Sequence, residues 1–291
     1  NITVVMVQIP LSLKEIEQKY LADSNSLVSP QLLRRLKQDS RVGVRKLSEK
    51  LQRRLYRQRQ EHERLEAMLH FERVLWKAGV EKIAGVDEAG IGPMAGPVVA
   101  AAVVFPPSTK IDGVDDSKRL SVDIRETLDA EIRKMASDVS IGVVEPGEID
   151  RLNIYHAGIR AMQIAVLGLS EPPDHVLVDS RFIPDLSQPQ NNFNRGDGLN
   201  FSIACASIVA KVHRDRIMLE FEHIYPNYGF ATHKGYCTSA HQEAVRELGP
   251  CPIHRRSFSY ICELQGEYDQ CFYDLKLKLK AAGTRDELEA W

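Results

Sequence analysis

The sequence predicts an α/β protein in which a mixed sheet is flanked by helices, with a helical N-terminal extension and a C-terminal helix. Three observations lead to this prediction. Short apolar runs rich in β-branched residues have the composition of buried strands. Longer segments after them have apolar residues at helical spacing. The segment from Leu11 to Lys77 contains a single glycine and a leucine stripe on a basic background.

The N-terminal extension, residues 1–79, is predicted to be helical. Leucines recur every four residues from Leu47 to Leu55 within a basic stretch, which places one apolar stripe on a charged helix. Ser29 followed by Pro30 is typical of a helix start. Such a basic helix either binds the backbone of a nucleic-acid duplex or packs by its stripe and leaves a solvated face.

The central region, residues 80–262, is predicted to form the α/β domain. Strands are expected at 82–87, 98–105, 139–144 and 176–179, and long helices at 153–169 and 200–223. Because strands come first and then alternate with helices, the sheet should be antiparallel at its start and partly parallel later. Residues 263–291 are predicted to form a C-terminal segment with one more charged helix, from 269 to about 282.

Composition limits the class of protein only loosely. A formal net charge of −2 over 291 residues excludes neither an enzyme nor a nucleic-acid binder, because local patches steer ligands more than net charge does. Five cysteines without metal-finger spacing are expected to be reduced thiols in a cytoplasmic protein. The first apolar run is too short to span a bilayer. A monomer without membrane association or an obligate protein partner is expected.

Four acidic residues follow or end predicted strands or stand in a loop before a helix: Asp87, Glu88, Asp179 and Asp197. Within a regular strand Asp87 and Glu88 would face opposite ways, whereas at a strand end the second is free to turn toward the first. Asp179 closes another apolar strand, and Asp197 lies in a loop before a long helix. Carboxylates at strand ends of an α/β sheet suggest a site at the sheet edge.

These carboxylates favour a hard divalent cation such as Mg²⁺ or Mn²⁺, because no cysteine or paired histidine lies near them in sequence. Two such ions about 3.5–4 Å apart would clamp the attacking and leaving oxygens of a phosphodiester. A single aspartate after a strand is more often a solvated loop residue or a helix cap. The adjacent pair Asp87 and Glu88, between an apolar strand and a turn rich in glycine and proline, favours the metal site.

The segment Gly85–Val104, GVDEAGIGPMAGPVVAAAVV, is similar to the signature of ribonuclease HII, the type 2 ribonuclease H family. Further matches follow in order at 116–121, 178–180, 195–197, 206–216, 225–230, 233–236 and 252–258. The resemblance implies a ribonuclease H-like fold and two divalent ions held by the acids at 87, 88, 179 and 197. It implies hydrolysis of RNA in RNA/DNA hybrids and cutting 5′ of ribonucleotides embedded in DNA, leaving 5′-phosphate and 3′-hydroxyl ends.

The resemblance also implies how a substrate is recognised. Backbone groups of Gly90, Ile91 and Gly92 would contact the 2′-hydroxyl of a ribonucleotide, since glycine lets a backbone approach closely. Tyr236 would pack on the sugar of the next deoxyribonucleotide. Ile91 stands where the family usually carries arginine or lysine, so one phosphate contact is expected to be missing. Binding should then be weaker, with a salt dependence lower by about one ion.

Basic residues within the matched segments are candidates to contact substrate phosphates: Lys118, Arg119, Lys211, Arg214, Arg216, Lys234, Arg255 and Arg256. Of these we favour Lys118, Lys234 and Arg255, because they share motifs with other candidate site residues. Asp215 lies between two arginines on a predicted helix and is expected to form structural ion pairs.

Two other interpretations stay open. The related ribonuclease HIII also carries an N-terminal extension, but its corresponding turn lacks the Gly-Pro-Met-Ala-Gly-Pro pattern found at 92–97. A hybrid-binding protein with little catalysis is favoured only by Ile91, and the four intact acids argue against it. The segment before residue 80 resembles the N-terminal extension of some bacterial ribonuclease HII proteins.

Overall fold

The computed structural model describes residues 9–22 and 28–266. The chain divides into two compact units, Asn1–Ala67 and Met68–Trp291. No helix in the described ranges is long and apolar enough to cross a membrane. The helix predicted at 269–282 lies outside the described residues.

The first unit is helical, as predicted. Its elements are α1 (Leu13–Glu17), the π-helical turn η1 (Gln18–Ala22), α2 (Pro30–Lys37) and α3 (Val42–Met68). The Ser29 hydroxyl accepts the amide of Leu32 and caps α2, with Pro30 in its first turn. Leu47 and Leu51 of α3 are buried in a core cluster of this unit. The leucine stripe therefore packs inside the unit, which favours the packed interpretation of the basic helix.

A buried carboxylate holds the turn before α3. Asp39 is fully buried and accepts hydrogen bonds from the Ile9 amide at 3.1 Å and from Arg41 Nε and Nη2, each at 2.9 Å. The hydrogen bonds from Arg41 hold the pKa of Asp39 well below its usual range, although burial opposes them. Arg41 also donates to the carbonyl oxygens of Ile9 and Leu11. This network links two segments about 30 residues apart.

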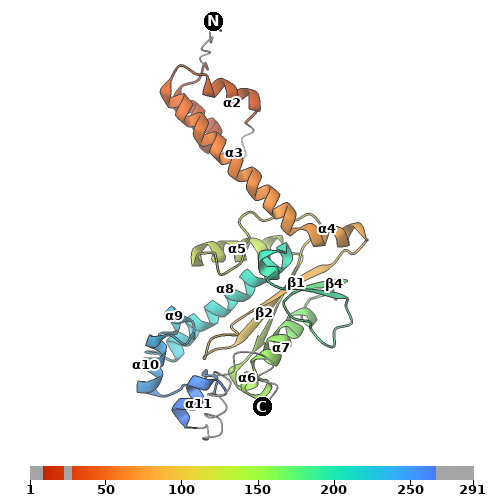
Figure 1. Ribbon diagram of the computed structural model, residues 1–291, viewed down its shortest axis with the longest axis vertical. Helices are drawn as coiled ribbons and strands as arrows, with labels where there is room; N and C mark the ends of the chain where they lie inside the picture. The colour runs from red at the N-terminus through yellow and green to blue at the C-terminus, as the bar shows by residue number, and fades with distance from the viewer. Residues whose placement is uncertain (1–8, 23–27, 267–291) are drawn as a thin grey trace, which may run out of the picture. The chain divides into compact units, whose positions relative to one another are not determined.

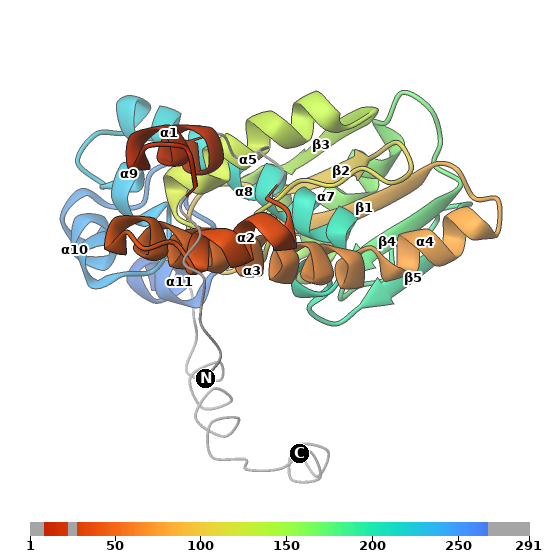
Figure 2. The same ribbon diagram turned by 90° about the horizontal axis from the view of Figure 1, so that it is seen from above.

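The second unit contains a five-stranded sheet in the order β3-β2-β1-β4-β5, visible in Figure 2. The strands are β1 (Ile83–Ala89), β2 (Val98–Val104), β3 (Asp138–Val144), β4 (His175–Asp179) and β5 (Gln190–Phe193). β1 pairs antiparallel with β2 and β2 with β3, whereas β1 pairs parallel with β4 and β4 with β5. The predicted change from antiparallel to parallel pairing is confirmed.

Long helices cover both faces of this sheet (Figure 1). On one face Ala84 and Val86 of β1 pack in a core cluster with Ala161 of α7 (Ile154–Leu167). On the other face α8 (Phe201–Ile224) approaches β1 so closely that a Cβ on Gly85 would lie 2.1 Å from the backbone of Ser202. Glycine at residue 85 therefore allows the central strand and α8 to pack backbone to backbone.

The remaining helices surround this core. They are α4 (His70–Lys77), α5 (Val122–Met135), α6 (Pro146–Leu152), the 3-10 turn η2 (Gly196–Gly198), α9 (Phe230–His233), α10 (Ser239–Leu248) and α11 (Ser259–Gln265). The sequence did not predict α5, α6, α9, α10 or α11. Phe230 is fully buried in a second, smaller cluster formed near the end of α8.

Candidate active site at the end of the central strand

A cavity of about 330 Å³ opens where β1 ends. It is lined by Asp87, Glu88, Ala89, Gly90, Ile91, Gly92, Ser117, Lys118, Asp179, Arg181, Ser207, Lys211 and Tyr236. Eight of the eleven site residues favoured from the sequence are in this lining. The exceptions are Asp197, Lys234 and Arg255.

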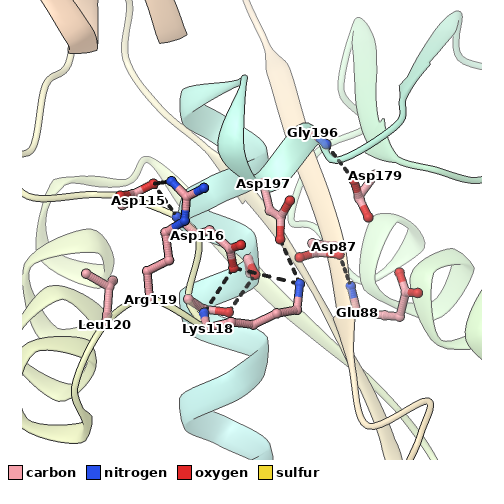
Figure 3. A network of polar contacts seen from close by, with 12 residues as sticks. Asp87, Glu88, Asp115, Asp116, Lys118, Arg119, Leu120, Asp179, Gly196 and Asp197 are labelled. Carbon is pink, nitrogen blue, oxygen red and sulfur yellow. Dashed lines mark hydrogen bonds and ion pairs between the residues drawn. The ribbon is translucent and has the colours of Figure 1, made fainter.

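Asp87 and Glu88 lie inside the strand, because β1 continues to Ala89. Figure 3 shows their carboxylates on opposite sides of β1. Asp87 and Ser207 of α8 both line the cavity, and the Asp87 Oδ1 accepts the Glu88 amide at 2.7 Å. The expectation that Glu88 turns out of the strand toward Asp87 is wrong, since strand alternation holds to the end. Both side chains still line the cavity because the chain turns away at Gly90.

Asp179 and Asp197 come from the parallel neighbour of β1 and from η2. Asp179 ends β4, and its Oδ1 accepts the Gly196 amide at 2.6 Å while its Oδ2 accepts the Ser180 hydroxyl at 3.0 Å. The Gly196 contact ties η2 to the end of β4. Asp197 follows directly, is 5% exposed, and accepts Lys118 Nζ at 2.9 Å (Figure 3).

The acids on β1 and β4 repel one another in a poorly solvated space. Burial raises the pKa of Asp87 well above its ordinary value, and the charges of Glu88 and Asp179 raise it further. Burial also raises the pKa of Glu88, although the Arg181 guanidinium opposes the rise. The pKa of Asp179 is raised by burial against the hydrogen bond from Gly196. Burial is the largest cause for all three carboxylates, so their charged forms are poorly solvated in the cavity.

This donor set fits a hard divalent cation. The buried Glu88 Oε2 has no hydrogen-bond partner in the described part of the chain, and all candidate donors are carboxylate oxygens. A divalent cation would offset the burial and the mutual repulsion that raise these pKa values. Within residues 9–22 and 28–266, however, no three acidic, histidine or cysteine side chains are already grouped as a metal-binding set. Lys118 instead lies against Asp197, with its Nζ also 3.7 Å from Asp116.

The ammonium of Lys118 is held in its charged form. Partial burial lowers the pKa of Lys118, but the hydrogen bond and charge of Asp197 outweigh burial and raise it. Lys118 therefore lies as a cation at the cavity wall. Lys234 does not line the cavity, and its Nζ donates to the Ala231 carbonyl at 2.5 Å.

Two buried arginines hold the glycine turn from behind. Arg255 is fully buried and donates to the carbonyls of Gly90 at 2.6 Å, Ile91 at 3.2 Å and Gly96 at 2.9 Å. Arg214 is also fully buried and bonds carbonyls of the same turn. The expectation that Arg255 and Arg214 contact phosphate is therefore wrong, because their donors already serve backbone carbonyls inside the protein.

The side of the turn that faces the cavity carries free donors. Gly90 has φ +97°, a conformation that favours glycine. Neither the Ile91 amide nor the Gly92 amide donates a hydrogen bond to any described residue. A Cβ on Gly92 would lie 3.7 Å from the Tyr236 ring, and Tyr236 is 45% exposed. Two unpaired amides and one aromatic face therefore lie side by side at the cavity.

Several supporting residues were missed in the sequence. Arg181 and Ser207 line the cavity, and their only sequence signal is their position beside or inside matched segments. Glu72 of α4 is buried and accepts the amide and hydroxyl of Ser202 in the first turn of α8. No sequence signal indicated Glu72. Asp215 forms ion pairs as predicted, with Lys211 and Arg125 rather than with its neighbours in the chain.

Solved structures share this fold. The crystal structure of the ribonuclease H2 from Pyrococcus horikoshii OT3 matches with a TM-score of 0.56 at 26% identity, over 64% of this chain and 98% of that chain. The ribonuclease HII in a PCNA complex from Archaeoglobus fulgidus matches with 0.52 at 27% identity, over 61% and 95%. The mixed sheet with its flanking helices is therefore the fold of a ribonuclease H-type nuclease.

The sequence comparisons identify one family within this fold. Residues 84–261 match the family model of ribonuclease HII, and residues 12–76 match that of the ribonuclease HII N-terminal domain. A ribonuclease HII from Myxococcus xanthus is 46% identical over 88% of this chain and 87% of its own length. One from Geobacillus kaustophilus is 48% identical over 79% and 88%. The chain belongs to the ribonuclease HII family.

Membership of this family settles the class of reaction. The protein is a divalent-metal-dependent endoribonuclease that cleaves RNA in RNA/DNA hybrids and ribonucleotides embedded in DNA. The matches to ribonuclease HII over most of the chain exclude the ribonuclease HIII and non-catalytic interpretations.

Proposed function

We propose that Asp87, Glu88, Asp179 and Asp197 hold two divalent cations, Mg²⁺ or Mn²⁺, and that the cut leaves 5′-phosphate and 3′-hydroxyl ends. The supporting observation is that Asp87, Glu88 and Asp179 line one cavity and have raised pKa values. Asp197 lies in η2, which the hydrogen bond from the Gly196 amide joins to Asp179. When bound, the ions would activate water as the nucleophile and stabilise charge on the leaving oxygen.

The protein's own groups orient these acids. The Gly196 amide and the Ser180 hydroxyl each donate to a different oxygen of Asp179, which fixes the plane of that carboxylate. The Ser207 hydroxyl lowers the pKa of Asp87, against the effect of burial, and lies 2.9 Å from the hydroxyl of Ser117. Such supporting hydrogen bonds fix ligand orientation before substrate arrives. Lys118, at the cavity wall, would hold a phosphate of the cut strand as a mobile point charge.

The glycine turn and Tyr236 supply the proposed specificity for a ribonucleotide followed by a deoxyribonucleotide. The unpaired amides of Ile91 and Gly92 are donors for the 2′-hydroxyl, the group that distinguishes RNA from DNA. The exposed ring of Tyr236 beside Gly92 offers a flat face to the next sugar. The proposal requires no protein partner for catalysis, only the nucleic-acid substrate. We further propose that the protein is a monomer and acts in the cytoplasm.

The test is cleavage of a labelled DNA duplex that contains one ribonucleotide, next to an all-RNA/DNA hybrid, with Mg²⁺, Mn²⁺ or a chelator. We expect metal-dependent cutting on the 5′ side of the single ribonucleotide, and its loss in Asp87→Asn. Cutting of the long hybrid alone would contradict the proposed junction reading by the turn and Tyr236. Full activity of Asp87→Asn would contradict the proposed metal site.

A further inference from the structure

Arg181 lines the cavity, and its guanidinium has a nitrogen without a hydrogen-bond partner in the described residues. It follows Asp179 and Ser180, at the end of β4, and its side chain is 21% exposed. Its Nη1 lies 3.5 Å from Glu88 Oε1 but forms no hydrogen bond to any residue that the structure describes. Its guanidinium stacks 5.1 Å from the centre of the Tyr155 ring. The charge is therefore held in place. Nη1 itself is buried, so a phosphate would bind through the solvent-exposed part of the side chain.

The same guanidinium lies next to the glycine turn. A Cβ built on Gly158 of α7 would be 2.5 Å from Arg181 Nη1 and 3.0 Å from Ile91 Cδ1. Both side chains thus pack on one glycine of α7, from β4 and from the turn respectively. Arg181 occupies this place only because residue 158 has no side chain. A cation from the segment after β4 is thereby positioned beside residue 91, which is uncharged.

We propose that Arg181 binds a phosphate of the substrate strand at the glycine turn and supplies there the positive charge that Ile91 does not. The inference rests on the proposed function of this cavity as the site of cleavage. Guanidinium is suited to this role because its fork of N–H donors matches two phosphate oxygens at once. The ion pair with Glu88 keeps the side chain pointing into the cavity until the phosphate arrives.

The experiment measures binding without hydrolysis. Fluorescence anisotropy of a labelled RNA/DNA hybrid in chelator, at several salt concentrations, gives the Kd and its salt dependence. The proteins are the full-length wild type, Arg181→Ala, Arg181→Lys, and Arg181→Ala combined with Ile91→Arg. Arg160→Ala is the matched control. Arg160 is an exposed arginine of α7 that does not line the cavity, and among the described residues its side chain bonds Gln163 alone.

For Arg181→Ala we expect the Kd to rise about tenfold, the effect of one lost charge-assisted hydrogen-bonded contact. The slope of log Kd against log salt should fall by about one phosphate contact. Arg181→Lys should keep the slope, because it keeps the charge. Adding Ile91→Arg to Arg181→Ala should restore most of the affinity. Arg160→Ala should change Kd no more than about twofold.

The proposal is overturned if Arg181→Ala changes Kd and slope no more than Arg160→Ala does. It is also overturned if Arg181→Ala lowers only the thermal midpoint, since the arginine would then merely neutralise Glu88. If Ile91→Arg does not restore the affinity lost in Arg181→Ala, residues 91 and 181 do not contact the same phosphate. Because binding is measured without metal, these outcomes are independent of the cleavage assay, whose failure would instead count against the proposed metal site.

Discussion

The buried carboxylate of Glu72 gives the sharpest test of how the site is supported. It accepts the Ser202 hydroxyl at 2.8 Å, the Ser202 amide at 3.0 Å and Asn200 Nδ2 at 3.2 Å. Asn200 caps α8, and its own amide donates to Gly196, next to Asp197. The contact between α4 and the start of α8 therefore supports η2 and its acid.

Glu72→Ala would leave three donors without an acceptor. At about 1 kcal/mol for each buried donor, plus a term for the space left by the side chain, the free energy of unfolding should fall by about 3–5 kcal/mol. Glu72→Gln keeps one acceptor oxygen, so its loss should be about 1 kcal/mol. Chemical denaturation of the three proteins measures both values. A loss below about 1 kcal/mol in Glu72→Ala would refute the network as a support.

The pH dependence supplies an independent check. Burial raises the pKa of Glu72 above its ordinary value of 4.5. The folded state therefore binds more protons than the unfolded state between these two values, and the stability from the raised pKa is lost as pH rises through that window. Glu72→Gln lacks this loss, so the stability difference between wild type and Glu72→Gln should narrow as pH rises. A constant difference from about pH 4 to pH 8 would contradict this reasoning.

Three further predictions concern the fold and the site. Gly85→Ala places a Cβ 2.1 Å from the Ser202 backbone, so β1 and α8 must separate; denaturation should give a loss of about 3 kcal/mol, and an unchanged midpoint would contradict the close packing. The pKa of Asp39 is lowered in the folded protein, so its charge stabilises the first unit at pH values above 3.8, its ordinary pKa. This stabilisation is lost as the pH falls below that value. The protection of the Arg41 amide, measured as its exchange rate relative to the intrinsic rate at the same pH, should therefore fall on acidification. It should fall much less in Asp39→Asn, which has already lost the charge. Tyr236→Ala should slow cutting at a single ribonucleotide about tenfold relative to long hybrid, with Tyr236→Phe near wild type; equal slowing on both substrates would argue against junction packing.

The sequence predicted the elements whose signal is local and apolar. β1 to β4 and the leucine stripe of α3 all have this signal. β5 was missed because its four residues, Gln190–Phe193, are largely polar and pair at the sheet edge. α5 was missed although Ser121 caps it and Leu128 and Ile132 bury one face. That pattern is short and interrupted by charged residues.

The candidate site was predicted unevenly for a similar reason. The favoured site residues all come from the matched segments, and eight of these eleven residues line one cavity. Whether an arginine faces solvent or the interior depends on contacts between distant segments. Arg255 bonds carbonyls about 160 residues earlier in the chain, and Glu72 serves an amide 130 residues later. No local pattern encodes such partners. Cytoplasmic location and a monomeric state stay predictions.

The arginines behind the glycine turn have a consequence for how this enzyme can change. Because Arg214 and Arg255 fix the carbonyl side of the turn, the path of the backbone does not depend on the side chain of residue 91. The Ile91 side chain does pack against the core cluster and Gly158 of α7, so a polar or charged residue there would change that packing while the arginines keep the backbone path. The backbone conformation of the turn is therefore set by residues outside it, whereas residue 91 itself lines the substrate cavity. Residue 91 is thus a suitable position at which to change substrate preference.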